Sequence, residues 1–148
     1  QAEIIFEDSN GEIDEIFEDD LPYDLQDDPI VLDNSGYGIW YIDSMDHLER
    51  YVDKRVRFTA QVLKPENFPE DYFVPGRMAM TCCAEDMSFL GYVCQYAGAA
   101  ELRMRDWVRV TAVVKEEYWA DYNGKGPVLH AESVERTKAP REEVISFM

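Results

Sequence analysis

The sequence has no run of apolar residues near the roughly 18–20 that crossing a bilayer requires. It also has no basic start followed by an apolar stretch, so we expect the chain as given to be soluble. The Gly-rich phosphate loop, the Gly-x-Ser-x-Gly nucleophile elbow and the His-Glu-x-x-His zinc motif are absent too. Because no nucleophile stands with a base in a recognisable pattern, we predict that the protein is not an enzyme.

Basic residues are scarce, and residues 1–33 have none. This segment holds thirteen of the 31 Asp and Glu residues and carries most of the net charge of −17, whereas the rest sums to only −4. A block of like charges resists compaction. We therefore predict an acidic arm over 1–33, partly disordered or docked, followed by one domain over 34–148. The same charge repels phosphate backbones, so we expect no nucleic-acid partner.

The remaining 115 or so residues are enough for one ordinary domain. Residues 28–42 are interpreted as extended segments around a turn at Asn34-Ser35-Gly36, where turn-forming residues cluster. A short helix is expected over 44–53, with Asp43 or Ser44 as its cap, because the apolar residues that follow fall on one face.

Five strands are predicted after this helix, at 54–63, 72–83, 89–96, 106–119 and 127–137. The first alternates strictly between apolar and polar residues, which is typical of a strand with one wet face. Pro75-Gly76 favours an edge position or a bulge in the second strand, and Asn123-Gly124 favours a hairpin turn before the fifth. With one or two helical turns over 97–104, this layout predicts a mainly β, OB-fold-like five-stranded Greek-key barrel.

The three cysteines are Cys82, Cys83 and Cys94, an odd number that does not suit a disulfide-stapled scaffold. Strand alternation would place Met78, Met80 and Cys82 on a core face, and Cys83 on the opposite face at the strand end. Packing, a thiol redox role and metal binding all stay open for these residues.

A metal site would use the sulfur and imidazole groups of the predicted barrel. The candidate ligands are Cys83, Asp86, Cys94 and His130, and the ion would be a soft one such as zinc, bound through thiolate. The rival function is an OB-type module that binds an oligosaccharide or a nucleic acid.

A set of motif residues lies within 54–140. They are Arg77, the Cys82-Cys83 pair, Asp86, the strand start Trp107-Val108, and Pro127 before the last strand. In these residues the chain resembles the C-terminal soluble domain of YcgQ-like permease subunits, which are bacterial membrane proteins without an assigned activity. Arg77, Cys82 and Trp107 match the structural part of the motif.

The resemblance implies a membrane location and a partner. The chain would be an accessory domain of a membrane-anchored protein at the cell membrane, with the extracytoplasmic side favoured. Its partner would be a multi-span permease, and it would act by protein contact. The resemblance identifies no ligand, so thiolate capture of a soft metal ion stays an open addition to this function.

Overall fold

The computed structural model describes residues 16–80 and 87–146. Within these ranges the helix is α1 (Asn34–Asp46), and the strands are β1 (Ile30–Leu32), β2 (Arg55–Leu63), β3 (Tyr72–Met80), β4 (Met87–Gly91), β5 (Cys94–Gln95), β6 (Trp107–Trp119), β7 (Gly124–Arg136) and β8 (Val144–Ser146). Short 3₁₀ turns lie at Glu18–Asp20, Leu48–Arg50, Ala99–Glu101 and Ala120–Tyr122. No helix in the described ranges is long and apolar enough to cross a membrane.

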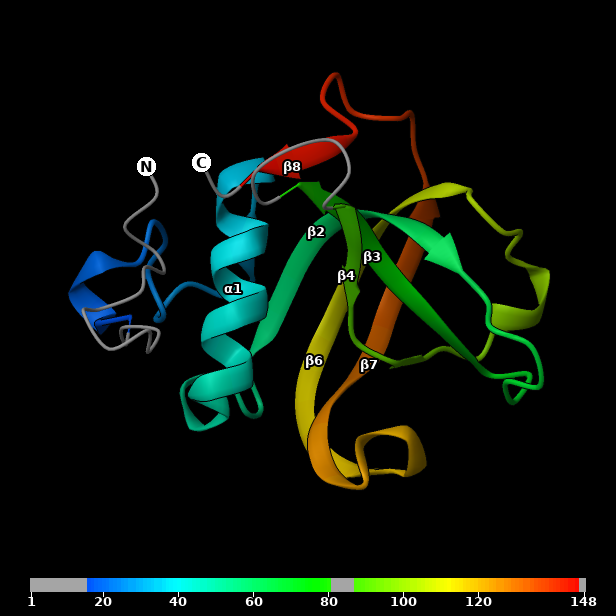
Figure 1. Cartoon of the computed structure of the whole chain (residues 1–148), viewed down its shortest axis with the longest axis horizontal. Helices are drawn as coiled ribbons and strands as arrows, with labels where there is room; N and C mark the ends of the chain where they lie inside the picture. The colour runs from blue at the N-terminus through cyan, green and yellow to red at the C-terminus, as the bar shows by residue number, and fades with distance from the viewer. Residues whose placement is uncertain (1–15, 81–86, 147–148) are drawn as a thin grey trace.

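The strands of the described residues all join one mixed sheet (Figure 1). Its order is β1-β2-β6-β7-β5-β3-β4, and β8 pairs with β3 off this path. β3 also pairs with β2, so part of the sheet forms a closed circuit. The circuit consists of the pairings β2–β6, β6–β7, β7–β5, β5–β3 and β3–β2. The prediction of a mainly β protein is confirmed.

Three of the predicted strands appear almost as expected. Along β2 every second residue is buried, from Val56 to Val62, which is the alternation that the sequence predicted. β6 and β7 form a long antiparallel hairpin, closed by the 3₁₀ turn and by Asn123 with a φ of 58°. Asn tolerates this left-handed conformation better than most residues, so the predicted turn is confirmed.

The prediction for residues 28–54 is wrong in its placement of the helix. Residues 34–46, predicted as extended around a turn, form α1, and the predicted helix over 44–53 reduces to the end of α1 and one 3₁₀ turn. The Asp33 carboxylate starts α1 by accepting a hydrogen bond of 2.7 Å from the Gly36 amide. The residues from Gly36 to Trp40 are all buried, so the helix has no polar stripe from which a sequence pattern could reveal it.

The two faces of β3 are the reverse of the prediction. Arg77 and Ala79 point inward and are 2% and 1% exposed, whereas Met78 and Met80 are only partly buried. The proposed core face is therefore wrong for both methionines, and Cys82 lies outside the described residues. Hydropathy alone assigns an arginine to water, and here the guanidinium is held inside by partners that the sequence does not reveal.

The prediction of an edge position for β3 is also wrong. β2 and β8 pair along one side of β3, and β4 and β5 pair along the other. The predicted third strand is split at Tyr92-Val93, opposite Val74-Pro75, so the irregularity lies on the neighbouring strand. Next to this break Gly91 passes close to β3, because a Cβ on Gly91 would lie 2.6 Å from the Pro75 carbonyl oxygen.

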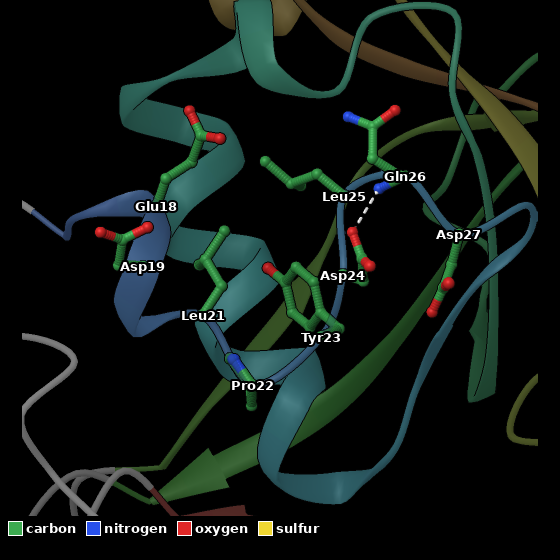
Figure 2. Close-up of a pocket in the computed structure, with 9 residues that line it drawn as sticks. All are labelled: Glu18, Asp19, Leu21, Pro22, Tyr23, Asp24, Leu25, Gln26 and Asp27. Atoms are coloured by element: carbon green, nitrogen blue, oxygen red, sulfur yellow. Dashed lines mark hydrogen bonds between the residues drawn. The ribbon is translucent and has the colours of Figure 1, made fainter.

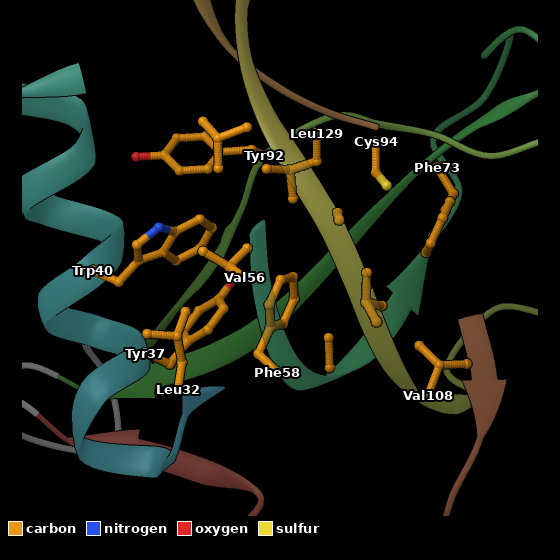
Figure 3. Close-up of a cluster of buried hydrophobic side chains, with 14 of the residues drawn as sticks. Leu32, Tyr37, Trp40, Val56, Phe58, Phe73, Tyr92, Cys94, Val108 and Leu129 are labelled. Carbon is orange, nitrogen blue, oxygen red and sulfur yellow. The ribbon is translucent and has the colours of Figure 1, made fainter. Parts of the chain in front are cut away.

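The hydrophobic core lies between α1 and the sheet (Figure 3). Its centre is Trp40, whose ring centroid is 5.4 Å from that of Tyr37, 5.5 Å from that of Phe58 and 5.4 Å from that of Tyr92. We call these four residues the inner aromatic cluster; each is at most 3% exposed. Farther from α1, the core contains Cys94 (Figure 3).

The described part of the acidic segment packs beside α1 and its following turn (Figure 1). Ile16 is buried, and its carbonyl oxygen accepts a hydrogen bond from Arg50. Arg50 also pairs with the fully buried Asp43 at 2.8 Å, and Asp43 accepts a 2.7 Å hydrogen bond from the Tyr51 hydroxyl. Tyr23 of the acidic segment extends this network through a 2.7 Å hydroxyl contact with Tyr51.

The end of the acidic segment joins the sheet. β1 pairs in parallel with β2, and Ile30 is fully buried. Just before β1, Asp28 forms an exposed ion pair with Arg55. Residues 28–32 are therefore attached to the domain by backbone pairing as well as by side chains.

Candidate functional site

The predicted metal ligands fall into two groups. Cys83 and Asp86, and with them Cys82, lie outside the described residues. Cys94 and His130 are described, and they lie on adjacent strands, with Gln95 of β5 in register with His130 of β7.

Cys94 is a core residue. It is fully buried and lies opposite Leu129. Burial raises the pKa of the Cys94 thiol, against a smaller lowering by a backbone hydrogen bond from Ala131. Because only the thiolate is a metal ligand, Cys94 acts in this fold as a small apolar side chain.

His130 points to the other face of the sheet. Its Nε2 lies 2.9 Å from Glu117 Oε1, and its side chain is 31% exposed. Strand alternation separates His130 from the face that Leu129 and Cys94 share. The structure therefore does not bring Cys94 and His130 together, and the described residues contain no group of three or more His, Cys, Asp or Glu arranged to hold a metal.

The motif residues Arg77 and Trp107 do meet. The Arg77 guanidinium lies 5.4 Å from the centre of the Trp107 ring, a cation–π contact. Its Nη1 donates to Asn34 Oδ1 at 2.9 Å, and its Nη2 donates to the Glu142 carbonyl oxygen at 2.7 Å. Burial lowers the pKa of Arg77, and these contacts join β3 to the start of α1 and to the segment before β8.

A cavity of about 500 Å³ lies beside Arg77. Its polar lining residues include Asp33, Ser35, Thr59, Arg109 and Glu142. The two arginines of the lining are offset by its two carboxylates, so the cavity does not favour a ligand of either charge.

A second cavity, of about 640 Å³, is formed by the acidic segment itself (Figure 2). The carboxylates of Glu18 and Asp19 lie on one side of it, and those of Asp24 and Asp27 on the other, with Tyr23 between them. The Asp24 carboxylate accepts a hydrogen bond from the backbone N–H of Gln26. Since the carboxylates are spread around the cavity, they do not form a shared coordination centre.

The third cavity, of about 380 Å³, has an aromatic wall. It lies between the loop joining β2 to β3 and the turn joining β6 to β7, and it is lined by Glu66, Asn67, Phe68, Pro69, Trp119, Ala120 and Asp121. The Phe68 and Trp119 ring centroids are 5.5 Å apart and meet edge to face, and Tyr72 packs on Trp119 with a centroid separation of 4.9 Å. We call this cavity the aromatic pocket.

The surroundings of the aromatic pocket are acidic. Glu66 and Asp121 in its lining are both exposed, and none of the described residues that line it is basic. Burial raises the pKa of the neighbouring Tyr72, and the charges of Asp71 and Glu117 raise it further. Negative potential therefore surrounds the rings.

The sequence interpretation missed this pocket. Residues 64–71 fall between two predicted strands, and Trp119 is the last residue of another, so neither is marked as part of a site. The available signal was an aromatic residue at each of two turns, Phe68 between Asn67 and Pro69 and Trp119 next to Ala120-Asp121. What the sequence does not show is that the strand pairing brings these two turns together.

One protein-family model matches most of this chain. The model of the DUF1980 C-terminal domain matches residues 9–145. The chain belongs to the DUF1980 C-terminal domain family. The match covers nearly all of the sequence, including the acidic segment from residue 9.

More distant comparisons add little to the DUF1980 assignment. Among curated protein sequences, none matches this chain. A solved structure described as a putative aspartyl-tRNA synthetase from Leishmania major Friedlin is similar over 68% of this chain and 21% of its own, at 15% identity and a TM-score of 0.41. This chain thus spans about a fifth of that protein, and a likeness so distant carries no functional information.

Proposed function

We propose that this DUF1980 domain is a non-enzymatic accessory domain of a bacterial membrane permease system, similar to YcgQ-like subunits. The supporting observation is the family match, which describes the domain as the C-terminal part of a protein. A C-terminal domain of this kind would be carried by a membrane-anchored segment of the same protein. It would contact a multi-span permease, on the extracytoplasmic side by preference.

The strand pairing favours an OB-like barrel as the scaffold of this accessory domain. Five successive pairings return to β2, and the contact between β5 and β7 is parallel while the others in the circuit are antiparallel. A closed Greek-key barrel leaves no free edges among its own strands. Such a scaffold would hold its loops rigidly for contact with a partner.

The permease proposal is tested by co-purification from membranes. The full-length protein is expressed with a candidate multi-span permease from the same organism, and the complex is extracted in detergent through a tag on this domain. We expect the cognate permease to co-purify, and an unrelated permease of similar size, expressed at the same level, to be lost. Equal recovery of both permeases, or of neither, contradicts the proposal.

Thiolate capture of a soft metal ion belongs to the same proposal. With Cys94 in the core and His130 on the other face, capture would depend on Cys83 and Asp86. Zinc titration of the reduced chain, with Cys83→Ser and the matched Cys94→Ser variant, tests this. The capture proposal expects loss of zinc binding only in Cys83→Ser. Failure of the reduced wild-type chain to bind zinc contradicts metal capture, but leaves the permease contact standing.

The second candidate function is an OB-type ligand-binding module. The observation that favours it is the aromatic pocket, because loops at this position of an OB-fold bind oligosaccharides and oligonucleotides. A net charge of −17 opposes binding of a nucleic acid, so a titration with single-stranded DNA at 150 mM salt is expected to show none. Micromolar binding in that titration would favour the nucleic-acid form of this module.

A further inference from the structure

The aromatic pocket combines partly exposed rings with carboxylates. Phe68 and Trp119 meet at an interplanar angle of 63°, so they form a corner rather than a flat stack. Phe68 and Trp119 are both only partly buried, which leaves ring surface in contact with solvent. Aromatic side chains stabilise a protein or a complex mainly through the surface that they remove from water. The ring surface still open to solvent is therefore available for contact with a ligand.

Carboxylates lie on both loops that form the pocket. Glu66 belongs to the loop that holds Phe68, and Asp121 belongs to the turn that follows Trp119. Neither forms an ion pair with a described residue at 4 Å or less. The face of an aromatic ring is itself the negative end of a quadrupole. The rings and the carboxylates thus both favour a positively charged ligand.

We propose that the aromatic pocket binds an organic ammonium group. The cation lies over the face of Trp119 or Phe68, where the ring quadrupole attracts it, and Glu66 and Asp121 neutralise its charge. A phosphate or carboxylate ligand is opposed by the same two side chains. This ligand class does not depend on a permease partner, so it stands or falls separately from the accessory function.

The pocket is large enough for a small alkylammonium ion. Its volume of about 380 Å³ lies in the range of small-molecule sites, which is roughly 300–1,000 Å³. Recognition of quaternary ammonium by aromatic side chains is an established use of the cation–π contact. A neutral ligand of the same shape would have the apolar contact but not the electrostatic attraction.

The test is a titration of the full 148-residue chain with choline and with its neutral isostere, 3,3-dimethyl-1-butanol. The three tryptophans each give an indole N–H signal in an NMR spectrum, and a Trp119→Phe variant assigns that of Trp119. We expect choline to shift the Trp119 signal in a saturable way, with those of Trp40 and Trp107 unchanged. We also expect the isostere to bind about tenfold more weakly. Sodium chloride at equal concentration is the salt control.

Variants separate the two parts of the site. The double variant Glu66→Gln, Asp121→Asn should weaken choline binding and leave the isostere unaffected. Tyr118→Phe is the matched control, because Tyr118 precedes Trp119 but points to the opposite face and is 67% exposed; it should bind choline as the wild type does. Unchanged Trp40 and Trp107 signals show that each variant is folded.

Three results overturn the proposal. The first is the absence of a saturable choline shift at Trp119. The second is equal affinity for choline and its isostere. The third is a Trp119 shift caused by a neutral hexasaccharide and not by choline, which would assign the pocket to carbohydrate.

Discussion

The inner aromatic cluster and the aromatic pocket differ in their surroundings. The inner aromatic cluster is covered by α1 and is almost free of solvent, and its hydroxyl groups have partners: Tyr37 donates to the Leu90 carbonyl oxygen, and Tyr92 contacts Ser44. The rings of the aromatic pocket lie in contact with one another but remain partly exposed.

The difference separates stability from binding. Rings that are fully buried contribute through the apolar area they remove from water. Rings that stay open to solvent beside carboxylates contribute less to folding and are available to a ligand. Substitutions in the inner aromatic cluster should therefore change stability, whereas substitutions in the aromatic pocket should change ligand binding.

The largest effect is expected for Trp40→Ala. Trp40 is fully buried at the centre of the inner aromatic cluster, so the change removes a whole ring and leaves a cavity. The free energy of unfolding should fall by about 3–5 kcal/mol. Denaturant titration measures this, and a loss below about 1 kcal/mol would show that α1 does not cover the core as described.

A smaller loss is expected for Gly91→Ala. The added Cβ would lie 2.6 Å from the Pro75 carbonyl oxygen and 2.9 Å from Val74 Cγ1. Backbone must move to relieve this contact, which should lower the free energy of unfolding by about 1–3 kcal/mol. Gly124→Ala is a matched control for crowding, since a Cβ there has nothing within 4 Å, although its φ of +158° adds some strain. Equal stability of wild type and Gly91→Ala would contradict the close approach of β4 to β3.

The alternating strands were predictable from sequence, and the helix and the pocket were not. β2 has one wet and one dry face, which gives a period-two pattern that depends only on local order. α1 is buried over five consecutive residues, so its sequence has no polar stripe, and Asp33 fixes its start. The inward position of Arg77 depends on Asn34, Glu142 and Trp107, which are distant in the sequence.

The candidate site shows the same limit. The sequence interpretation considered Cys94 and His130 together because both carry possible ligands, but the register of β5 and β7 puts them on opposite faces. The aromatic pocket arises from two turns about 50 residues apart. Single-sequence patterns describe neighbours along a strand, and both features depend on neighbours across strands.

Alkaline pH should destabilise the protein, and the inner aromatic cluster should contribute part of this effect. Burial raises the pKa of Tyr37 and of Tyr92 in the folded state. At a pH above about 10, each tyrosine ionises in the unfolded chain but stays neutral in the folded chain. Their contribution to the free energy of unfolding is therefore complete below about pH 10 and is lost as the pH rises further. Each tyrosine should lower the free energy of unfolding by about 1.4 kcal/mol per pH unit above pH 10.

The alkaline slope is measured by denaturant titration from pH 8 to pH 11. Tyr37→Phe should make the free energy of unfolding fall less steeply with pH. The variant should also lose some stability at every pH, because the hydrogen bond to Leu90 is missing. A Tyr37→Phe slope equal to that of the wild type would contradict the burial of this hydroxyl.

The smallest effect on stability is expected for Trp119→Ala, at about 1 kcal/mol, because this ring is only partly buried and its contacts with two neighbouring rings are edge-to-face or tilted. The same variant should lose ligand binding completely. A ligand that binds only the folded state stabilises it by RT ln(1 + [L]/Kd), or about 1.4 kcal/mol at a concentration ten times Kd. Thermal unfolding with and without choline therefore compares both aromatic groups in one experiment.

The most direct test applies this experiment to the wild type, Trp119→Ala and Tyr37→Phe at equal ionic strength. We predict that choline raises the unfolding midpoint of the wild type and of Tyr37→Phe by the same few degrees, although Tyr37→Phe starts lower. It should leave Trp119→Ala unchanged. If choline stabilises Trp119→Ala as much as the wild type, or stabilises none of the three, the division between a structural and a ligand-binding aromatic group is wrong.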